Sequence, residues 1–94
     1  MYEQKRAFKG IWIPIEIWDN TDLEILEKIL LADIESDCSN HQVCFADVNY
    51  WVWLLQVKER KVKHLLASLE WKGFIESTTV DGKHVIRICR ERLV

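Results

Sequence analysis

Five basic side chains fall within seven consecutive positions near the middle of the chain. Arg and Lys at this density can pair with phosphate groups, and they can donate hydrogen bonds to base edges in the major groove of DNA. Arg60 and His64 are the candidates for base-edge contact, whereas Lys58, Lys61 and Lys63 are assigned to phosphates. The alternative interpretation is a solvated basic helix face with no ligand.

A second set of candidates lies in a predicted β-hairpin. The β-rich runs 74–79 and 83–90 flank Asp81-Gly82, a dipeptide preferred in tight hairpin turns. Lys83, His84 and Arg87 are candidates for contact with phosphate or the minor groove. Ordinary solubility of a turn explains these three residues equally well. The apolar residues of the second run do not alternate cleanly, so the strand register stays open.

Two helices joined by a short turn are predicted to present the first set. From Val62, steps of 3.6 residues per turn place Leu65, Leu66 and Leu69 on one buried stripe. The opposite, exposed face then carries Arg60, His64, Ala67 and Trp71. This second helix is expected over about residues 58–72. In the helix before it, which Asp47 caps, the residues turned inward are Trp51, Val52 and Leu55.

The helix pair resembles the winged helix-turn-helix domains near the N-termini of phage and plasmid replication initiator and replisome-organiser proteins. The likeness is carried by Asp47, Trp51-Val52, Leu55-Gln56-Val57-Lys58, Arg60, Val62 and Gly73-Phe74-Ile75, with residues 8–14 and Trp18 at the start. Gln56 stands where that family usually has Gly, and Lys58 stands where it usually has a Ser or Thr cap. The resemblance implies an α+β fold with a three-helix core and a C-terminal β-hairpin wing, over residues 1–94 as a single domain.

The elements before the helix pair follow from local signals. Residues 1–9 are expected to be a flexible arm, residues 10–13 a short strand, and Pro14 the start of a brief helical turn through Trp18. A capping box over residues 21–24 predicts a helix to about Ser36, followed by a polar loop over 37–43 and a minimal strand over 44–46. The buried stripe of this helix is expected to be Leu23, Leu26, Ile29, Leu30 and Ile34. Its solvated side is expected to be Glu24, Glu27, Lys28 and Glu35.

Length and composition favour one small intracellular domain. The chain has 94 residues, of which 49% are hydrophobic, and no apolar run approaches the roughly 20 residues of a membrane span. The first residues lack a hydrophobic segment after their charges, so no signal peptide is expected. An odd number of cysteines in such a chain indicates reduced thiols and a cytoplasmic location. Whether the chain is a fragment of a longer protein stays open.

The charge is unevenly distributed along the chain. Residues 1–50 hold four Lys/Arg and ten Asp/Glu, a net charge of −6, whereas residues 51–94 hold nine and five, a net charge of +4. The overall charge of −2 therefore hides a basic half that contains both sets of candidates. Local fields rather than the total charge decide whether a polyanion binds.

Few features of the sequence indicate metal binding or catalysis. Cys38, His41 and Cys44 are spaced like zinc ligands, but structural zinc needs four ligands, and ordinary core or loop cysteines are favoured. Asp33 falls within a buried arc, where a lone carboxylate more often bonds a nearby backbone group. No phosphate loop, nucleophile elbow or His-x-x-x-His helix is present, so neither an enzyme nor a cofactor is expected.

The predicted function is double-stranded DNA binding, as the N-terminal module of a replication protein. One alternative is a transcriptional regulator with the same DNA contacts, and another is a protein-interaction domain that leaves DNA untouched. Trp53 and Leu54 either pack against the N-terminal strand, which is favoured, or form a surface for a homodimer or a replication-protein partner. Trp71 is expected to be covered by the hairpin. No membrane contact is expected.

Overall fold

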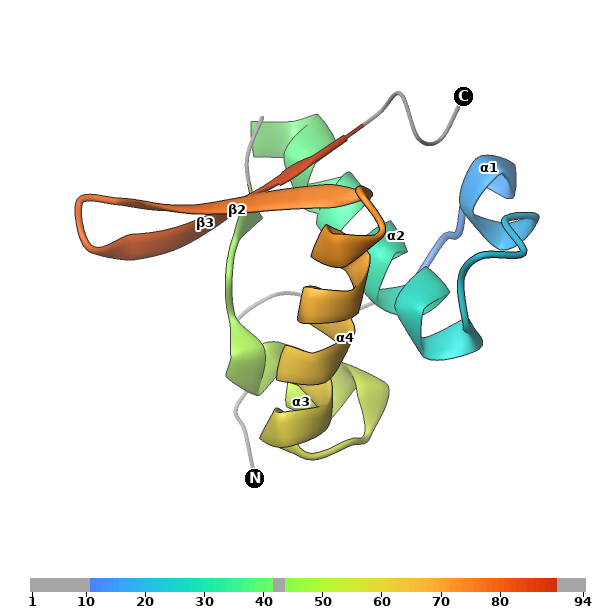
Figure 1. Ribbon diagram of the computed structural model, residues 1–94, viewed down its shortest axis with the longest axis horizontal. Coiled ribbons are helices and arrows are strands. Elements are labelled where there is room, and N and C mark those ends of the chain that lie inside the picture. Colours follow the sequence, from blue (N-terminus) through green and yellow to red (C-terminus); the bar gives the residue numbers. More distant parts are fainter. Residues whose placement is uncertain (1–10, 42–43, 90–94) are drawn as a thin grey trace.

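The structure is a computed structural model that describes residues 11–41 and 44–89, without the side chains of residues 39–41. Over these residues the fold is α+β, with four helices and one three-stranded antiparallel sheet (Figure 1). The helices are α1 (Ile15–Trp18), α2 (Ile25–His41), α3 (Val48–Leu55) and α4 (Glu59–Trp71). The strands are β1 (Cys44–Phe45), β2 (Ile75–Val80) and β3 (Lys83–Ile88). The expected arm over residues 1–9 lies outside the described residues.

Among the described residues, none of the helices combines the length and the apolar composition needed to cross a bilayer.

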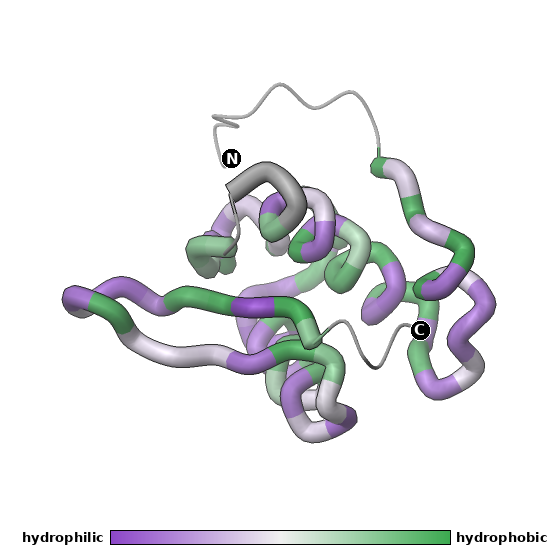
Figure 2. Tube along the Cα trace, turned by 90° about the horizontal axis from the view of Figure 1, so that it is seen from above, coloured by the Kyte–Doolittle hydropathy of each residue, from purple (hydrophilic) through white to green (hydrophobic). Residues whose placement is uncertain are grey.

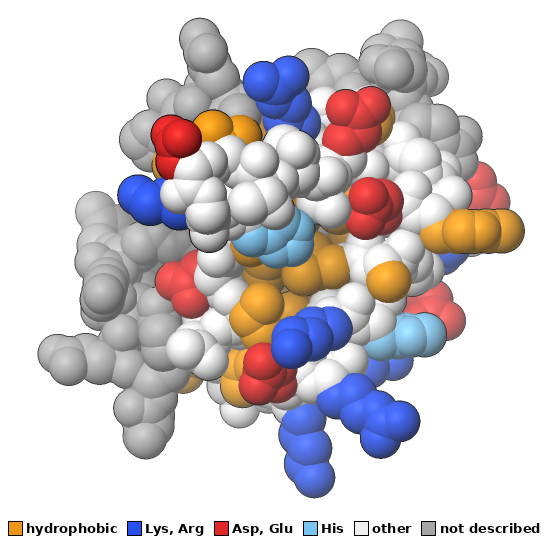
Figure 3. All heavy atoms as spheres, turned by 60° about the vertical axis from the view of Figure 1, so that its left-hand side comes forward, with side chains coloured by type: hydrophobic (Ala, Val, Ile, Leu, Met, Phe, Trp, Pro, Cys, Tyr) orange, Lys and Arg blue, Asp and Glu red, His pale blue; other side chains and the backbone are white. Residues whose placement is uncertain are grey.

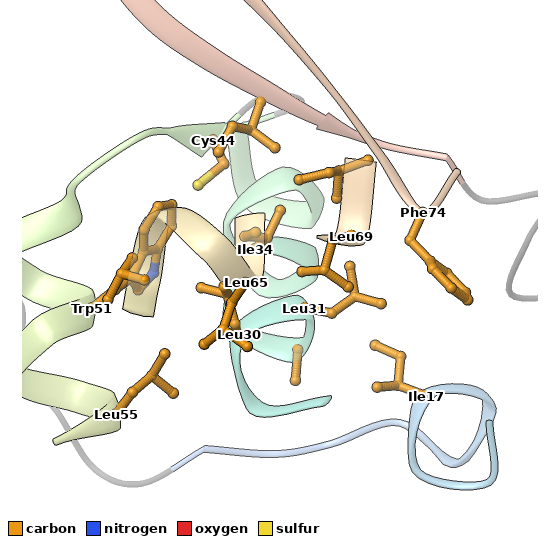
Figure 4. Close-up of a cluster of buried hydrophobic side chains, with 14 of the residues drawn as sticks. Ile17, Leu30, Leu31, Ile34, Cys44, Trp51, Leu55, Leu65, Leu69 and Phe74 are labelled. Atoms are coloured by element: carbon orange, nitrogen blue, oxygen red, sulfur yellow. The ribbon is translucent and has the colours of Figure 1, made fainter. Parts of the chain in front are cut away.

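Helix α2 lies at the centre of the fold. It packs against α1, α3, α4, β1 and β3, and only β2 among the described elements lies away from it. Leu30, Leu31 and Ile34 of α2 are fully buried. They point into the same cluster as Trp51 of α3 and Leu65 of α4 (Figure 4). One central helix therefore holds both the helix pair and the sheet in place.

Both predicted ends of α2 are wrong. The helix begins at Ile25, because residues 20–23 form a turn in which the Asn20 side chain accepts the Asp22 N–H. The Glu27 carboxylate reaches back to the Glu24 N–H at 2.9 Å, so this half of a capping box lies one turn later than predicted. The helix continues to His41 through the predicted loop. Cys38 extends the row of Leu30 and Ile34 at four-residue spacing, so packing on the core favours helix there.

Glu27, predicted to face solvent, is 1% exposed. Its carboxylate accepts hydrogen bonds from Ser68 Oγ at 2.7 Å and from Lys72 Nζ at 2.9 Å. Burial raises the pKa of Glu27, but the Glu24 N–H, Lys72 and Ser68 together lower it by more, so the pKa lies below its ordinary value. We call Glu27, Ser68 and Lys72 the α2–α4 polar cluster, because it joins these two helices through their side chains.

The strand predicted over residues 10–13 is not present over residues 11–13, and residue 10 lies outside the described residues. Ile11 and Ile13 pack against the core whereas Trp12 is exposed, so the inward and outward alternation is present. In the described part of the chain, however, the sheet consists of β1, β3 and β2, and this segment joins none of them. The predicted helical turn after Pro14 is present as α1, with Ile17 fully buried.

The ends of the helix pair are fixed by local hydrogen bonds. Asp47 caps α3 as predicted, since its side chain accepts the Tyr50 N–H at 3.0 Å. At the end of α4, Gly73 takes a positive φ of 86°, and the N–H of Phe74 donates to the Leu69 carbonyl at 3.0 Å. This is the Schellman arrangement that a C′ glycine favours. Both helix ends are therefore encoded in the residues beside them.

Asp33 accepts a hydrogen bond from a side chain of another helix, whereas the sequence predicted a bond with a nearby backbone group. The Trp51 indole N–H donates to Asp33 Oδ2 at 2.8 Å, and both residues are buried. This contact joins α2 to α3 inside the core.

The sheet has the strand order β1-β3-β2, with β3 in the centre. Phe45 and Thr78 both pair with Val85, and Val80 pairs with Lys83 next to the Asp81-Gly82 turn. Ile86 points into the core cluster, whereas Val85 belongs to the opposite face and is also buried. A central strand buried on both faces shows no polar alternation, which explains why the sequence left the register open.

Candidate nucleic-acid interface

The turn between α3 and α4 carries the two unusual residues noted in the sequence. Gln56 has a left-handed backbone (φ 58°, ψ 43°), a conformation that costs a residue with a Cβ about 1–2 kcal/mol. Its side-chain Nε2 donates to the Trp53 carbonyl at 2.7 Å. Lys58 is the N-cap of α4, and its side chain makes no capping hydrogen bond. It also places a positive charge at the positive end of the helix dipole.

Helix α4 separates its two faces as predicted. Val62, Leu65 and Leu69 are buried, and Leu66 is half-buried. The opposite face carries exposed side chains over its whole length, and these are Arg60, His64, Ala67 and Trp71. The helix therefore presents its basic N-terminal half to solvent.

Four of the five candidates on α4 converge. An open, shallow hollow at the start of the helix is lined by Lys58, Arg60, Lys61 and His64, with Val57 among them. The fifth candidate, Lys63, forms an ion pair with Glu59 at 3.1 Å, one turn away. Both side chains of that pair are mostly exposed, so the pair contributes little to stability.

The three candidates on the hairpin are exposed but do not share one face. Lys83 and Arg87 alternate with Val85, so they lie on the outer face of the sheet. His84 alternates with Ile86 and lies on the face that the core helices cover further along the strand. A second hollow is lined by Phe45 of β1, by Ala46 just after it, and by Lys83 and His84 of β3.

Phe45 is an exposed aromatic residue within this second hollow. The Lys83 ammonium lies 5.8 Å from the centroid of its ring, within the range of a cation–π contact. On the side shown in Figure 3, basic side chains lie at two levels, with hydrophobic side chains and a histidine exposed between them and carboxylates interspersed. The arrangement offers separate cationic contacts on either side of a less polar surface.

Three further aromatic or apolar candidates have clear positions. Trp53 and Leu54 are half-buried and pack against the core, and the Trp53 ring lies 5.8 Å from that of Tyr50. This pair therefore packs on the core itself, whereas the strand against which it was predicted to pack does not form over residues 11–13. Trp71 is 88% exposed, so the prediction that the hairpin covers it is wrong. The hairpin leaves α4 and extends in another direction (Figure 1).

The cysteines are reduced thiols. Cys38 Sγ donates to the Ile86 carbonyl at 3.8 Å, and Cys44 Sγ to the Phe45 carbonyl at 3.7 Å. Burial, together with the neighbouring Asp37 and Cys38, raises the pKa of Cys44 well above its ordinary value. Within the described residues no three potential ligands are grouped to hold a metal ion, and the side chain of His41 lies outside that description.

Comparison with known proteins gives no family model, no curated protein and no solved structure that matches this chain. The function must therefore be argued from the residues of the candidate interface.

Sequence reasoning missed two residues of the interface. Val57 was assigned only to the turn, although its place between Gln56 and Lys58 puts it beside the basic cluster. Phe45 was assigned only to a strand. The alternation of one strand could have found it, because Cys44 faces inward and its neighbour must then face outward.

Proposed function

We propose that this chain is a winged helix-turn-helix domain that binds double-stranded DNA. In this proposal α4 is the recognition helix and enters the major groove, and the β2–β3 hairpin is the wing. The observation that carries the proposal is that Lys58, Arg60, Lys61 and His64 are all exposed at the N-terminal end of α4, where they line one open hollow. Recognition helices contact base edges mainly through their N-terminal residues.

The order of the elements supports this assignment. Helices α3 and α4 are separated only by residues 56–58, and the hairpin follows α4 directly. Strand β1 lies just before the helix pair and adds a third strand to the hairpin. This arrangement is compatible with a winged helix. The role in replication, as the N-terminal module of an initiator or replisome organiser, depends only on the family resemblance of the sequence.

The candidates on the hairpin lie on two faces of the sheet, which limits the contacts that they can make with DNA at the same time. Only one face of a two-stranded ribbon can lie against a groove at a time. Lys83 and Arg87 share the outer face of the sheet, so they would reach phosphates together, and His84 would not join them. Phe45 pairs with Val85 and so lies on this outer face with Lys83, and both line the hollow that also includes Ala46 and His84.

Salt-dependent DNA binding tests the proposal. The double variant Lys58→Gln, Lys61→Gln removes two phosphate contacts, so the slope of log K against log salt should flatten by about 2. The matched control is Thr21→Glu, Ser36→Glu, which lowers the net charge by the same two units at exposed positions far from the hollow. Fluorescence anisotropy with a labelled duplex gives both slopes.

The control separates a defined site from general electrostatics. We expect the control to keep the parent slope, with only a small loss of affinity. Equal losses in the two variants, or no duplex binding by the parent chain at low salt, would refute the proposal. In the latter case a protein-interaction role for the same fold would become the better explanation.

A further inference from the structure

The end of the molecule around α1 carries an unusual amount of exposed apolar surface. Four of the seven large hydrophobic residues that are exposed in the described part of the chain lie between positions 12 and 25. They are Trp12 (79% exposed), Ile15 (60%), Trp18 (48%) and Ile25 (53%). In Figures 1 and 2 this segment lies at the end of the molecule opposite the tip of the hairpin. We call these four residues the α1 patch.

The α1 patch is held on an anchored element. Helix α1 is short, but Ile17 at its centre is fully buried in the core. Its neighbours Ile15 and Trp18 therefore keep a fixed outward direction. Lys28 of α2 also holds the segment, because its Nζ donates to the Trp18 carbonyl at 2.5 Å and lies 4.9 Å from the ring centroid. Exposed apolar surface of this kind marks interaction sites.

Carboxylates are interleaved with the α1 patch. Glu16, Asp19, Asp22 and Glu24 are all exposed. Among the described residues, two ammonium groups contact this segment: Lys28 contacts Trp18, and Lys72 contacts Glu27 and the Asp22 carbonyl. The result is an apolar patch in a field of negative charge, and a partner must complement both properties.

We propose that the α1 patch docks a basic amphipathic helix of a partner protein. The apolar face of that helix would lie on Trp12, Ile15, Trp18 and Ile25, and its Lys or Arg residues would lie beside the carboxylates. Helices of this kind bind through apolar anchors, and charge complementarity selects the correct partner. The proposal goes beyond DNA binding and does not depend on it.

Other occupants fit the charges less well. A two-fold dimer would place the same acidic patch against itself, and like charges across an interface are unfavourable. A head-to-tail contact with a second copy would have to use the cationic hollow on α4 as its complement. An anionic membrane surface would repel the carboxylates. A basic peptide is the partner that satisfies both the apolar and the charged groups.

The test is a binding titration of the full chain with a synthetic helical peptide of Lys and Leu, arranged with Leu on one face. A peptide with every Lys replaced by Glu is the matched control ligand. We expect the basic peptide to bind and the acidic peptide to bind at least tenfold more weakly. Ile15→Ser, at an exposed position, should weaken binding of the basic peptide by about tenfold without changing the melting temperature.

A pair of charge variants shows whether binding occurs at the α1 patch. The double variant Glu16→Gln, Asp19→Asn should bind the basic peptide about tenfold more weakly than the parent chain does. Glu76→Gln, Asp81→Asn at the hairpin removes the same charge from exposed positions and should leave affinity within about twofold. Equal effects of the two double variants would overturn the proposal, and so would equal binding of the two peptides.

Two further measurements identify rival occupants. If sedimentation shows that the parent chain self-associates and that Ile15→Ser makes it monomeric, a second copy occupies the patch and the proposal is wrong. If deletion of residues 1–9 strengthens peptide binding more than tenfold, the chain's own N-terminal segment is the occupant, which also overturns it. A monomeric chain whose peptide affinity is unchanged by the deletion supports the proposal. None of these outcomes depends on whether α4 binds DNA.

Discussion

Replacement of Glu27 by Ala should destabilise the fold more than any change to an exposed acidic residue. The Glu27 carboxylate is buried and accepts hydrogen bonds from the Glu24 N–H, Ser68 Oγ and Lys72 Nζ. Truncation leaves three donors without this acceptor: one just before α2, one in α4 and one at the end of α4. The α2–α4 polar cluster would then lose its only carboxylate.

The magnitude follows from the three contacts. A neutral hydrogen bond contributes about 1 kcal/mol, and a bond to a charged group about 1.5–3 kcal/mol. Lys72 keeps its hydrogen bond to the Asp22 carbonyl, and its side chain is 25% exposed, so water can solvate part of its charge. The lower end of the range therefore applies, about 1.5 kcal/mol for each of the three bonds. Burial of the carboxylate opposes them, so we expect a net loss of about 3 kcal/mol. For a domain of this size that corresponds to a fall in Tm of roughly 15 °C.

Urea unfolding of a double-mutant cycle measures the effect. The cycle combines Glu27→Ala with Lys72→Ala, and we expect a coupling energy of about 1.5 kcal/mol. Glu24→Gln is the control, because only the backbone N–H of this exposed residue joins the cluster. Its stability should stay within about 0.5 kcal/mol of the parent.

Glu27 should also make the free energy of unfolding of the parent chain depend on pH. The pKa of Glu27 in the folded state lies below 4.5, the ordinary value that it regains on unfolding. Its contribution is therefore fully present above pH 4.5 and is lost as the pH falls through the folded-state pKa. The difference in stability between the parent chain and Glu27→Ala should therefore narrow at acidic pH. A Glu27→Ala loss below 0.5 kcal/mol at neutral pH, or a difference that persists unchanged in acid, would refute this reasoning.

Two other predictions concern single sites. Gln56→Gly should raise the free energy of unfolding in urea by about 0.5–1 kcal/mol, because Gly adopts φ 58° without strain. The substitution removes only an exposed side-chain hydrogen bond. A decrease in stability would mean that this hydrogen bond outweighs the strain. An alkylating reagent should modify half-buried Cys89 well before Cys44, because burial and a raised pKa keep the Cys44 thiol protonated and inaccessible. Mass spectrometry of the labelled peptides measures both rates, and equal rates in the folded chain would contradict this order.

The parts of the fold that the sequence predicted well have their signals close by in the chain. Asp47 caps α3, Gly73 ends α4, and Asp81-Gly82 forms the hairpin turn with φ angles of 51° and 76°. Each signal acts over a few residues through a hydrogen bond or a backbone preference. The helix pair and the hairpin were therefore placed to within about a residue or two, which is the usual uncertainty of helix ends.

The failures occurred where tertiary contacts decide. Glu27 looks like a surface residue until Lys72, far along the chain, supplies its partner. Residues 11–13 alternate like a strand, but pairing requires a neighbouring strand that the topology does not provide. Helix α2 continues to His41 because Cys38 has a core to pack against. None of these partners can be read from the local pattern.

The sequence predicted which residues belong to the candidate interface, but it did not predict which of them lie together. Helical periodicity correctly placed the basic residues of α4 on an exposed face. Strand alternation alone separates His84 from Lys83 and Arg87. Which of the two faces lies on the core follows from the packing of β3, because Ile86 belongs to the core cluster.

The central position of α2 has a consequence for how the molecule opens. Because α1, α3, α4, β1 and β3 all pack on this one helix, neither half of the chain retains a core when the other half leaves. We therefore expect the helix pair and the sheet to unfold together, so that their backbone amides share the slow solvent exchange of global unfolding. The hairpin tip contributes little to that packing, so local opening should need the least free energy there.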